Sequence, residues 1–344
     1  MKGVYFPGTG EAHLKEWPDP TVHPDDVLIK IKASALCRTD LSIYYGNPVV
    51  GKKAPGEVIP GHEPCGIITK TGKNAKHFKE GDRVVASIFV GCGFCKYCRA
   101  GEPNICERVE ILGFDRHGGD AEFLVVPENV CLPMPDEMSY ITGAISTDVI
   151  GNLYSTMKEM NVSGKDIVAI IGVGPMGLGG TLSAKGMGAT VVALDLVDSR
   201  LNKAKTLGAD YIVNAKEQNP VEFLMKLTNG EGVDKSVECS GTPEGVATCL
   251  DITRKHGCVA QIGEMAEAKI KPSAQFLRKK LTYYGSWYFY LQEWGGIADF
   301  IVNRIGNDKA EKMVSKRYSL TEQDISQAFK LFDQHKTDKV VFTP

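Results

Sequence analysis

The sequence predicts an α/β protein in which a β-rich domain is joined to a doubly wound parallel sheet. Up to about residue 150, short β-type runs are broken by Gly and Pro, with examples at 27–33, 65–70, 83–88 and 121–126. After Asn152 the pattern changes to strands that alternate with helices. Closely spaced turns favour an antiparallel sheet in the first part, whereas strand–helix alternation favours a parallel sheet covered on both faces in the second.

The elements of the second part follow one another without long gaps. We expect strands at 167–171, 190–194, 211–213, 233–238, 258–262 and 281–290, with helices that end near 187, 207 and 227. The remaining residues predict helices at 294–305 and 322–333 and a terminal strand at 340–342. This tail is too short to form a domain of its own. We therefore expect one discontinuous domain, 1–150 with 290–344, and a second domain at 151–289.

Composition limits the classes of partner. The chain has 344 residues, of which 43% are hydrophobic and 24% charged, and 40 basic residues face 42 acidic ones. Such a chain can bury two cores, and its net charge of −2 provides no field that attracts nucleic acid or an anionic membrane. The N-terminus lacks the apolar region of a signal peptide, and no run reaches the roughly 18 apolar residues of a membrane span. We expect a cytoplasmic protein with reduced thiols and a small-molecule substrate.

Four of the ten cysteines form a tight cluster. Cys92, Cys95, Cys98 and Cys106 have the spacing C-x2-C-x2-C-x7-C. Four thiolates so spaced can converge on one Zn²⁺, and a shell of four cysteines leaves no position for substrate, so the predicted site is structural. An iron–sulfur cluster also uses four cysteines, but ferredoxin spacings differ. A zinc ribbon that binds nucleic acid is disfavoured because no basic stripe with aromatic residues follows.

A glycine-rich turn follows the strand at 167–171 and opens the next helix. Its residues are Gly172, Val173, Gly174, Pro175, Met176 and Gly177. The pattern G-x-G-x-x-G is weak evidence alone, but the strand–turn–helix context that it needs is present. Gly172 permits the tight turn, Gly174 lets the backbone approach a pyrophosphate, and Gly177 lets the helix pack closely on the strand. The free N–H groups of the helix would face the phosphates.

An acidic residue ends the following strand. Asp195 lies 18 residues after the last glycine of the turn. A carboxylate there accepts hydrogen bonds from the adenosine ribose and repels a 2′-phosphate, which selects NAD over NADP. Asp195 could also serve as a helix N-cap. Arg200 is expected to cover the ribose, although an exposed helical arginine is more often only solvated.

Together these motifs resemble the zinc-dependent medium-chain alcohol and polyol dehydrogenases over essentially the whole chain. The resemblance rests on CRTD at 37–40, GHE at 61–63, the four-cysteine spacing and GVGPMG followed by Asp195, in the family's order. It implies a GroES-like catalytic domain, to which the C-terminal segment returns, and a Rossmann-type nucleotide-binding domain. It also implies two zinc ions per chain, one catalytic and one structural.

The resemblance assigns roles to single residues. Cys37 and His62 would bind the catalytic zinc, and the third ligand, a Cys or an acid in this family, would be Asp148; a helix N-cap is the alternative for Asp148. Glu63 would enter the zinc shell during ligand exchange, and Asp40 would hold the second ring nitrogen of His62. Arg38 would meet the coenzyme pyrophosphate, as would Lys339, for which a salt bridge at the rim is an equal interpretation.

The implied reaction is hydride transfer from an alcohol to NAD. Zinc lowers the pKa of an alcohol oxygen bound in its open position, and Thr39 would carry the proton away. Many relatives have a histidine two residues after the position of Asp40, where this chain has Ser42, so the later relay would run through Ser42, ribose hydroxyls and water.

The predicted substrate is a secondary alcohol, such as a polyol, sugar or cyclitol, which the enzyme converts to a ketone. L-threonine 3-dehydrogenase or a simple secondary-alcohol dehydrogenase is the nearest alternative, and an inactive nucleotide-binding relative is the non-enzymatic one. The short linker between the cysteine cluster and the sheet favours a homotetramer over a dimer.

Overall fold

The computed structural model describes residues 1–344 and divides into two compact units. Unit 1 comprises Met1–Asp148, Tyr290–Val302 and Gly306–Pro344, and unit 2 comprises Val149–Phe289 and Asn303–Ile305. The first crossing between the units therefore lies two residues before the expected one at 150, and residues 303–305 of the expected tail belong to unit 2. None of the helices combines the length and apolar character that spanning a bilayer requires.

Unit 1 is built on a seven-stranded sheet. Its strands run in the order β16-β17-β3-β4-β5-β9, and β8 also pairs with β3. Their bounds are β3 Asp26–Ala35, β4 Glu63–Thr71, β5 Arg83–Ala86, β8 Phe123–Pro127, β9 Cys131–Pro133, β16 Val314–Tyr318 and β17 Lys339–Phe342. Two small sheets accompany it, β1 Lys2–Tyr5 with β2 His13–Glu16 and β6 Phe89–Val90 with β7 Glu110–Ile111. The helices are α1 Asp40–Tyr44, α2 Lys96–Arg99, α3 Tyr140–Ala144, α9 Trp294–Phe300, α10 Asn307–Ala310 and α11 Glu322–Asp333.

Apolar side chains at every second position of β3 form part of the core of this unit. Val27, Ile29 and Ile31 point to one face and are at most 1% exposed, where they pack with residues such as Ile68 and Leu124. The period of two that predicts a strand therefore also determines which face of the sheet is buried.

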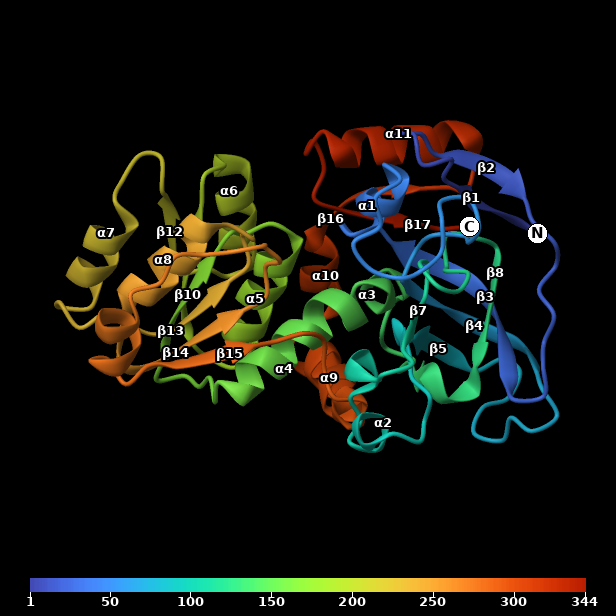
Figure 1. Cartoon of the computed structure of the whole chain (residues 1–344), viewed down its shortest axis with the longest axis horizontal. Helices are drawn as coiled ribbons and strands as arrows, with labels where there is room; N and C mark the ends of the chain where they lie inside the picture. The colour runs from blue at the N-terminus through green and yellow to red at the C-terminus, as the bar shows by residue number, and fades with distance from the viewer. The chain divides into compact units, whose positions relative to one another are not determined.

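The C-terminal tail completes the sheet of unit 1. Strand β17 pairs antiparallel with β3, so that Val341 lies opposite Ala35, and β16 pairs parallel with β17. In Figure 1 the red elements β16, β17 and α11 accordingly lie beside the blue N-terminal strands. The sequence predicts β17 but not β16, because the edge strand VSKRY carries exposed charges instead of an alternating apolar pattern.

Unit 2 is a parallel sheet of six strands in the order β12-β11-β10-β13-β14-β15. The strands are β10 Ile167–Ile171, β11 Thr190–Asp195, β12 Tyr211–Asn214, β13 Val233–Glu238, β14 Thr253–Gln261 and β15 Thr282–Gly285. The helices are α4 Asn152–Glu159, α5 Pro175–Gly186, α6 Asp198–Leu207, α7 Pro220–Leu227 and α8 Pro243–Ile252 (Figure 1). The order reverses between β10 and β13, which makes the carboxyl ends of these two strands the topological switch point.

Two expected elements of the second half are shorter than predicted. The strand expected at 281–290 ends at Gly285, and Tyr288 then adopts a positive φ of 75° while it and Phe289 are buried. Tyr288 and Phe289 are therefore buried by packing and not by pairing within the sheet. The helix expected at 294–305 is α-helical only to Phe300 and finishes as a π-helical turn.

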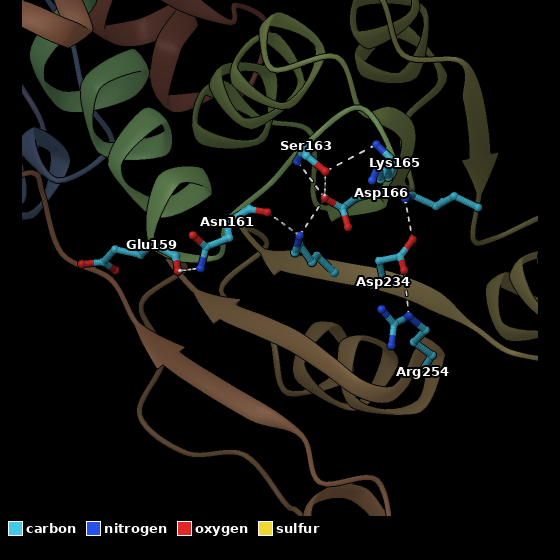
Figure 2. Close-up of polar contacts among 9 residues, drawn as sticks. Glu159, Asn161, Ser163, Lys165, Asp166, Asp234 and Arg254 are labelled. Atoms are coloured by element: carbon cyan, nitrogen blue, oxygen red, sulfur yellow. Dashed lines mark hydrogen bonds and ion pairs between the residues drawn. The ribbon is translucent and has the colours of Figure 1, made fainter.

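The amino ends of the central strands are tied together by charged side chains (Figure 2). Lys235 of β13 donates to Asp166 at 2.7 Å and to the carbonyl of Asn161 at 2.8 Å. Asp234 accepts from the backbone N–H of Ile167 and from Arg254, each at 2.7 Å. This network lies at the edge of the sheet opposite to the glycine-rich turn, since in a parallel sheet all amino ends share one edge.

Candidate functional site

Four potential metal ligands from three parts of unit 1 converge. The ligand atoms of Cys37, His62, Glu63 and Asp148 all lie within 4.8 Å of one another. Cys37 follows β3, His62 and Glu63 stand at the start of β4, and Asp148 lies in the π-helical turn Ser146–Gly151. The structure thus brings Asp148 to the other three ligands and does not place it at a helix N-cap.

Asp40 orients two of these ligands at once. Its Oδ1 is 2.9 Å from Nδ1 of His62, and its Oδ2 accepts the backbone N–H of Cys37 at 2.9 Å. The side chain is fully buried, so no water competes for these bonds. A carboxylate on Nδ1 fixes the imidazole tautomer in which Nε2 has its lone pair free for a metal.

The residues present fit a zinc ion. Thiolate, imidazole and carboxylate are the ligand types that zinc binds, and three protein ligands with an open position characterise a catalytic site. Glu63 adds an independent sign, because its buried Oε2 has no hydrogen-bond partner. A buried carboxylate oxygen without a partner costs free energy unless a cation satisfies it.

Lys339 lies beneath this cluster and not at the surface. Its Nζ forms an ion pair with Oε1 of Glu63, and the two side chains are 1% and 0% exposed. Burial opposes the charge of Lys339, but the Glu63 carboxylate raises its pKa above the ordinary lysine value. Lys339 thus forms the salt bridge that was the alternative interpretation, but the pair is buried and does not lie at the rim. The expected contact with the pyrophosphate stays a prediction. The sequence does not reveal the pair because its members are 276 positions apart.

The Thr39 hydroxyl lies beside one of the potential metal ligands, whereas the Ser42 hydroxyl is bonded to the backbone. The Thr39 hydroxyl lies 3.6 Å from Sγ of Cys37. The Ser42 hydroxyl donates to the backbone carbonyl of Thr39 at 2.7 Å and accepts from the backbone N–H of Val49 at 3.3 Å. Because both bonds go to the backbone, the Ser42 hydroxyl holds the turn, and the structure does not show the expected step through Ser42.

The second cluster is formed by the four cysteines alone. The Sγ atoms of Cys92, Cys95, Cys98 and Cys106 lie within 4.8 Å of one another. Backbone N–H groups point at the sulfurs, including that of Cys95, which donates to Cys92 at 3.4 Å, and that of Arg108, which donates to Cys106 at 3.3 Å. Backbone hydrogen bonds lower the pKa of the Cys92 thiol to about 6 and also lower that of Cys95, which favours their thiolates, whereas burial raises the pKa of Cys98 to about 12. The site has the composition of a closed structural zinc site.

The sequence does not predict a further carboxylic acid close to the site, Asp120, which contacts Gly61 next to His62. Asp120 is fully buried; its Oδ1 accepts from the Ser34 hydroxyl at 2.7 Å, and its Oδ2 has no partner. Asp120 packs against Gly61, where an added Cβ would lie 2.4 Å from Oδ1. Burial, and then the neighbouring Asp40, raise the pKa of Asp120 to about 7.

This shift predicts a pH-dependent stability that Asp120→Asn removes. The unfolded carboxyl has a pKa near 4, so between pH 4 and 7 the folded state binds the extra proton, and stability falls as pH rises. Between pH 5 and pH 8 the free energy of unfolding of D120N should improve relative to the wild type by about 2 kcal/mol. Urea denaturation at both pH values measures it. Asp136→Asn, at a side chain 97% exposed, should show no such trend.

The glycine-rich turn of unit 2 has the geometry of a dinucleotide site. Gly172 has a φ of +82°, and a Cβ there would lie 2.6 Å from Cα of Ser240. A Cβ on Gly177 would lie 2.0 Å from the carbonyl oxygen of Gly172, so only glycine fits, whereas Gly174 faces open space. Pro175 and Met176 begin α5, with Gly174 at the N-cap and no side chain capping it. The N–H groups of this helix end can therefore bind phosphate.

Asp195 lies directly beside this turn. Its Oδ2 accepts the backbone N–H of Val173 at 2.8 Å, and its Oδ1 accepts those of Leu196 and Val197 at 2.7 and 3.0 Å. Nη1 of Arg200 lies 3.9 Å from Oδ1. The N-cap of α6 is Val197, so the carboxylate is not a helix cap.

Arg38 belongs to unit 1 and is held by the end of α11. Its Nη2 donates to the carbonyl of Phe332 at 2.9 Å and lies 2.7 Å from Nδ1 of His335. The guanidinium also covers the ring of Phe332. Its expected contact with the coenzyme pyrophosphate stays a prediction.

Curated relatives of this chain are zinc-type dehydrogenases. An uncharacterized zinc-type alcohol dehydrogenase-like protein of Escherichia coli, YphC, is 36% identical over 296 residues, 83% of this chain and 84% of the relative. An L-threonine 3-dehydrogenase of Bacillus velezensis is 36% identical and covers 72% of this chain and 71% of its own. A sorbitol dehydrogenase of Bacillus subtilis is 31% identical and covers 94% of this chain and 91% of its own.

Family models and a solved structure agree with these relatives. Residues 23–136 match the alcohol dehydrogenase GroES-like domain, and residues 175–303 match the zinc-binding dehydrogenase domain. The alcohol dehydrogenase TADH from Thermus sp. ATN1 superposes with a TM-score of 0.90 at 28% identity, over 100% of this chain and 99% of that one. The two motif-bearing halves, the two clusters of metal ligands and the relatives lead to one conclusion: the chain belongs to the zinc-dependent medium-chain alcohol dehydrogenase family.

Proposed function

We propose that this oxidoreductase oxidises a secondary alcohol of the polyol, sugar or cyclitol class to a ketone with NAD as hydride acceptor. The observation that carries the proposal is the set formed by Cys37, His62 and Asp148, joined by Glu63, whose buried Oε2 has no hydrogen-bond partner. Zinc would act there as a Lewis acid toward the alcohol oxygen, and the nicotinamide would accept the hydride.

The protein groups around this set divide the remaining work. Asp40 keeps His62 in one tautomer and fixes the backbone of Cys37, so both ligands are oriented before substrate arrives. The Thr39 hydroxyl, 3.6 Å from the Cys37 sulfur, is the group that accepts the proton of the alcohol. Because Ser42 is bonded to the backbone, the proton then passes to a ribose hydroxyl or to water.

Relatives that align with most of the chain support a secondary alcohol as the substrate. The sorbitol dehydrogenase of Bacillus subtilis aligns with 94% of the chain, and an L-threonine 3-dehydrogenase of Pyrococcus horikoshii aligns with 98% at 32% identity. The acidic ligand Asp148 fits both classes, and the galactitol-1-phosphate dehydrogenase of Escherichia coli, which superposes with a TM-score of 0.89, favours a polyol. L-threonine 3-dehydrogenase is the second candidate because a relative of that name is 36% identical.

A substrate screen distinguishes these candidates. Formation of NADH is followed with polyols, inositols, L-threonine and short secondary alcohols at equal concentration. We expect the highest kcat/KM on a hydroxylated substrate. Turnover confined to short alcohols would overturn the polyol class, and a preference for L-threonine would establish the second candidate.

Asp195 is expected to set the coenzyme preference. Its substitution by serine removes the charge that repels a 2′-phosphate, so the preference for NAD over NADP should fall by about 10-fold or more. The preference is the ratio of kcat/KM values with the two coenzymes. Asp198→Ser is the matched control, because that carboxylate is bound to Asn214 at 2.7 Å, and it should leave the ratio unchanged. A wild type that prefers NADP would refute the assignment.

Two further expectations belong to the same proposal. We infer two zinc ions per chain because the structure contains two separate ligand clusters. The homotetramer and the cytoplasmic location stay predictions; sedimentation equilibrium of the purified enzyme tests the first.

A further inference from the structure

The loop after β13 contains a buried carboxylate that the proposed chemistry does not use. Glu238 is the last residue of β13 and is 0% exposed. Its Oε1 accepts the backbone N–H groups of Ser240 at 2.7 Å and Gly241 at 3.1 Å, and also the Ser240 hydroxyl. Its Oε2 accepts Gly241 N–H at 3.2 Å and Nε2 of Gln261 at 2.9 Å. One carboxylate therefore fixes the loop after β13 and joins it to the end of β14.

This loop is packed directly against the glycine-rich turn. The Cα of Ser240 is the atom that would lie 2.6 Å from a Cβ on Gly172. The backbone N–H of Cys239 donates to the carbonyl of Ile171 at 2.8 Å, which ties the loop to the strand that leads into the turn. The loop 239–242 therefore lies beside the phosphate-binding turn, on its β13 side.

The surroundings of Glu238 are shaped to hold it. A Cβ on Gly245 would lie 2.5 Å from Oε1, and one on Gly263 would lie 2.5 Å from Oε2. Glycines thus admit the carboxylate from two sides, and its backbone carbonyl accepts from Ile262 and Gly263. A side chain with four donor groups on its two oxygens and no solvent access has a single position.

The position of Glu238 at the carboxyl end of β13 indicates the role of the loop that it holds. β10 and β13 flank the switch point, where a dinucleotide crosses the carboxyl edge of a doubly wound sheet. Asp195 marks the adenosine side at β11, so the nicotinamide half lies on the side of β13 and β14. We propose that Glu238 is a positioning residue that holds the loop 239–242 in the shape required by the nicotinamide half of the coenzyme. This inference rests on the proposed coenzyme site.

The test compares the binding of a whole and a half coenzyme. Glu238→Gln keeps the size of the side chain but turns one acceptor into a donor that faces other donors. We expect the Kd of NADH, measured by calorimetry on the zinc-loaded enzyme, to rise about 10-fold, while the Kd of AMP changes less than about 2-fold. The milder Gln261→Met, which removes one donor to Oε2, should weaken NADH binding by a smaller factor.

A matched control is available on the same strand. Asp234 lies at the opposite end of β13 and accepts from Ile167 and Arg254 (Figure 2). Asp234→Asn should lower the thermal midpoint and leave the Kd of NADH unchanged. E238Q and Q261M that bind NADH like the wild type, or that weaken NADH and AMP equally, would overturn the proposal. If the wild type bound NADPH more tightly than NADH, the proposed NAD preference would be refuted but not the role of Glu238. The Kd values of the wild type and E238Q would then be compared with NADPH in place of NADH.

Discussion

Substituting Cys37 by alanine should reduce kcat/KM by about 1,000-fold, since a Lewis acid supplies several kcal/mol of transition-state stabilisation and about 4 kcal/mol corresponds to that factor. Asp40 accepts the backbone N–H of Cys37 and so orients this ligand. The thiol of Cys37 is the one sulfur in the group that it forms with His62 and Asp148. We expect zinc per chain, measured by elemental analysis, to fall from about two to about one, because the four-cysteine cluster is separate.

The matched control is another cysteine of the same unit. Cys65 lies two residues after Glu63, is buried, and donates to the carbonyl of Tyr140 at 3.0 Å, but it is not part of either cluster. Cys65→Ala should keep both zinc ions and most of the activity. Full activity in C37A, or loss of both ions, would contradict the assignment of Cys37 to a catalytic site distinct from the structural one.

Lys339→Met should be among the most destabilising substitutions in the chain. It leaves the fully buried Glu63 without its cationic partner, and breaking a buried pair from one side typically costs about 3–5 kcal/mol. The free energy of unfolding from urea denaturation measures the loss. Because Glu63 belongs to the ligand group, we also expect the catalytic zinc to be retained less well on dialysis.

Two further variants isolate the buried charge as the cause. The double variant Glu63→Gln with Lys339→Met removes both charges and should recover part of the stability lost in K339M. Lys53→Met breaks an exposed pair with Glu57, 3.7 Å apart with both side chains 49% exposed, and should cost less than about 0.5 kcal/mol. If K339M lowered the free energy of unfolding as little as K53M, the buried ion pair would not stabilise the site.

The fold was largely predictable because its signals are local. The strands expected at 167–171 and 233–238 match β10 and β13 residue for residue, and the expected helix 322–333 matches α11. A period of two or 3.6 residues identifies such elements without knowledge of their partners. Strand β16 was missed and the last strand of the parallel sheet was predicted too long, since pairing at a sheet edge is decided by neighbours and not by local pattern.

The candidate site was predictable only where a motif has fixed spacing. The four cysteines and the glycine-rich turn lie within short segments, whereas Cys37, His62 and Asp148 were linked through a family resemblance alone. The partners of these residues could not be found in this way. Lys339 reaches Glu63 across 276 positions, and Asp120 reaches Ser34 across 86, so only the folded chain reveals these contacts.

If the two ligand clusters hold zinc ions with different purposes, stepwise removal of zinc will separate their effects. During titration of the purified enzyme with a chelator, NAD-linked turnover and zinc per chain are measured in the same samples. We predict that turnover falls to zero in proportion to the loss of the first zinc ion, while the second stays bound by the four cysteines, and that added zinc restores turnover. Turnover that survives loss of the first ion, or that falls only as the second is lost, would contradict the assignment of a catalytic zinc to Cys37, His62 and Asp148.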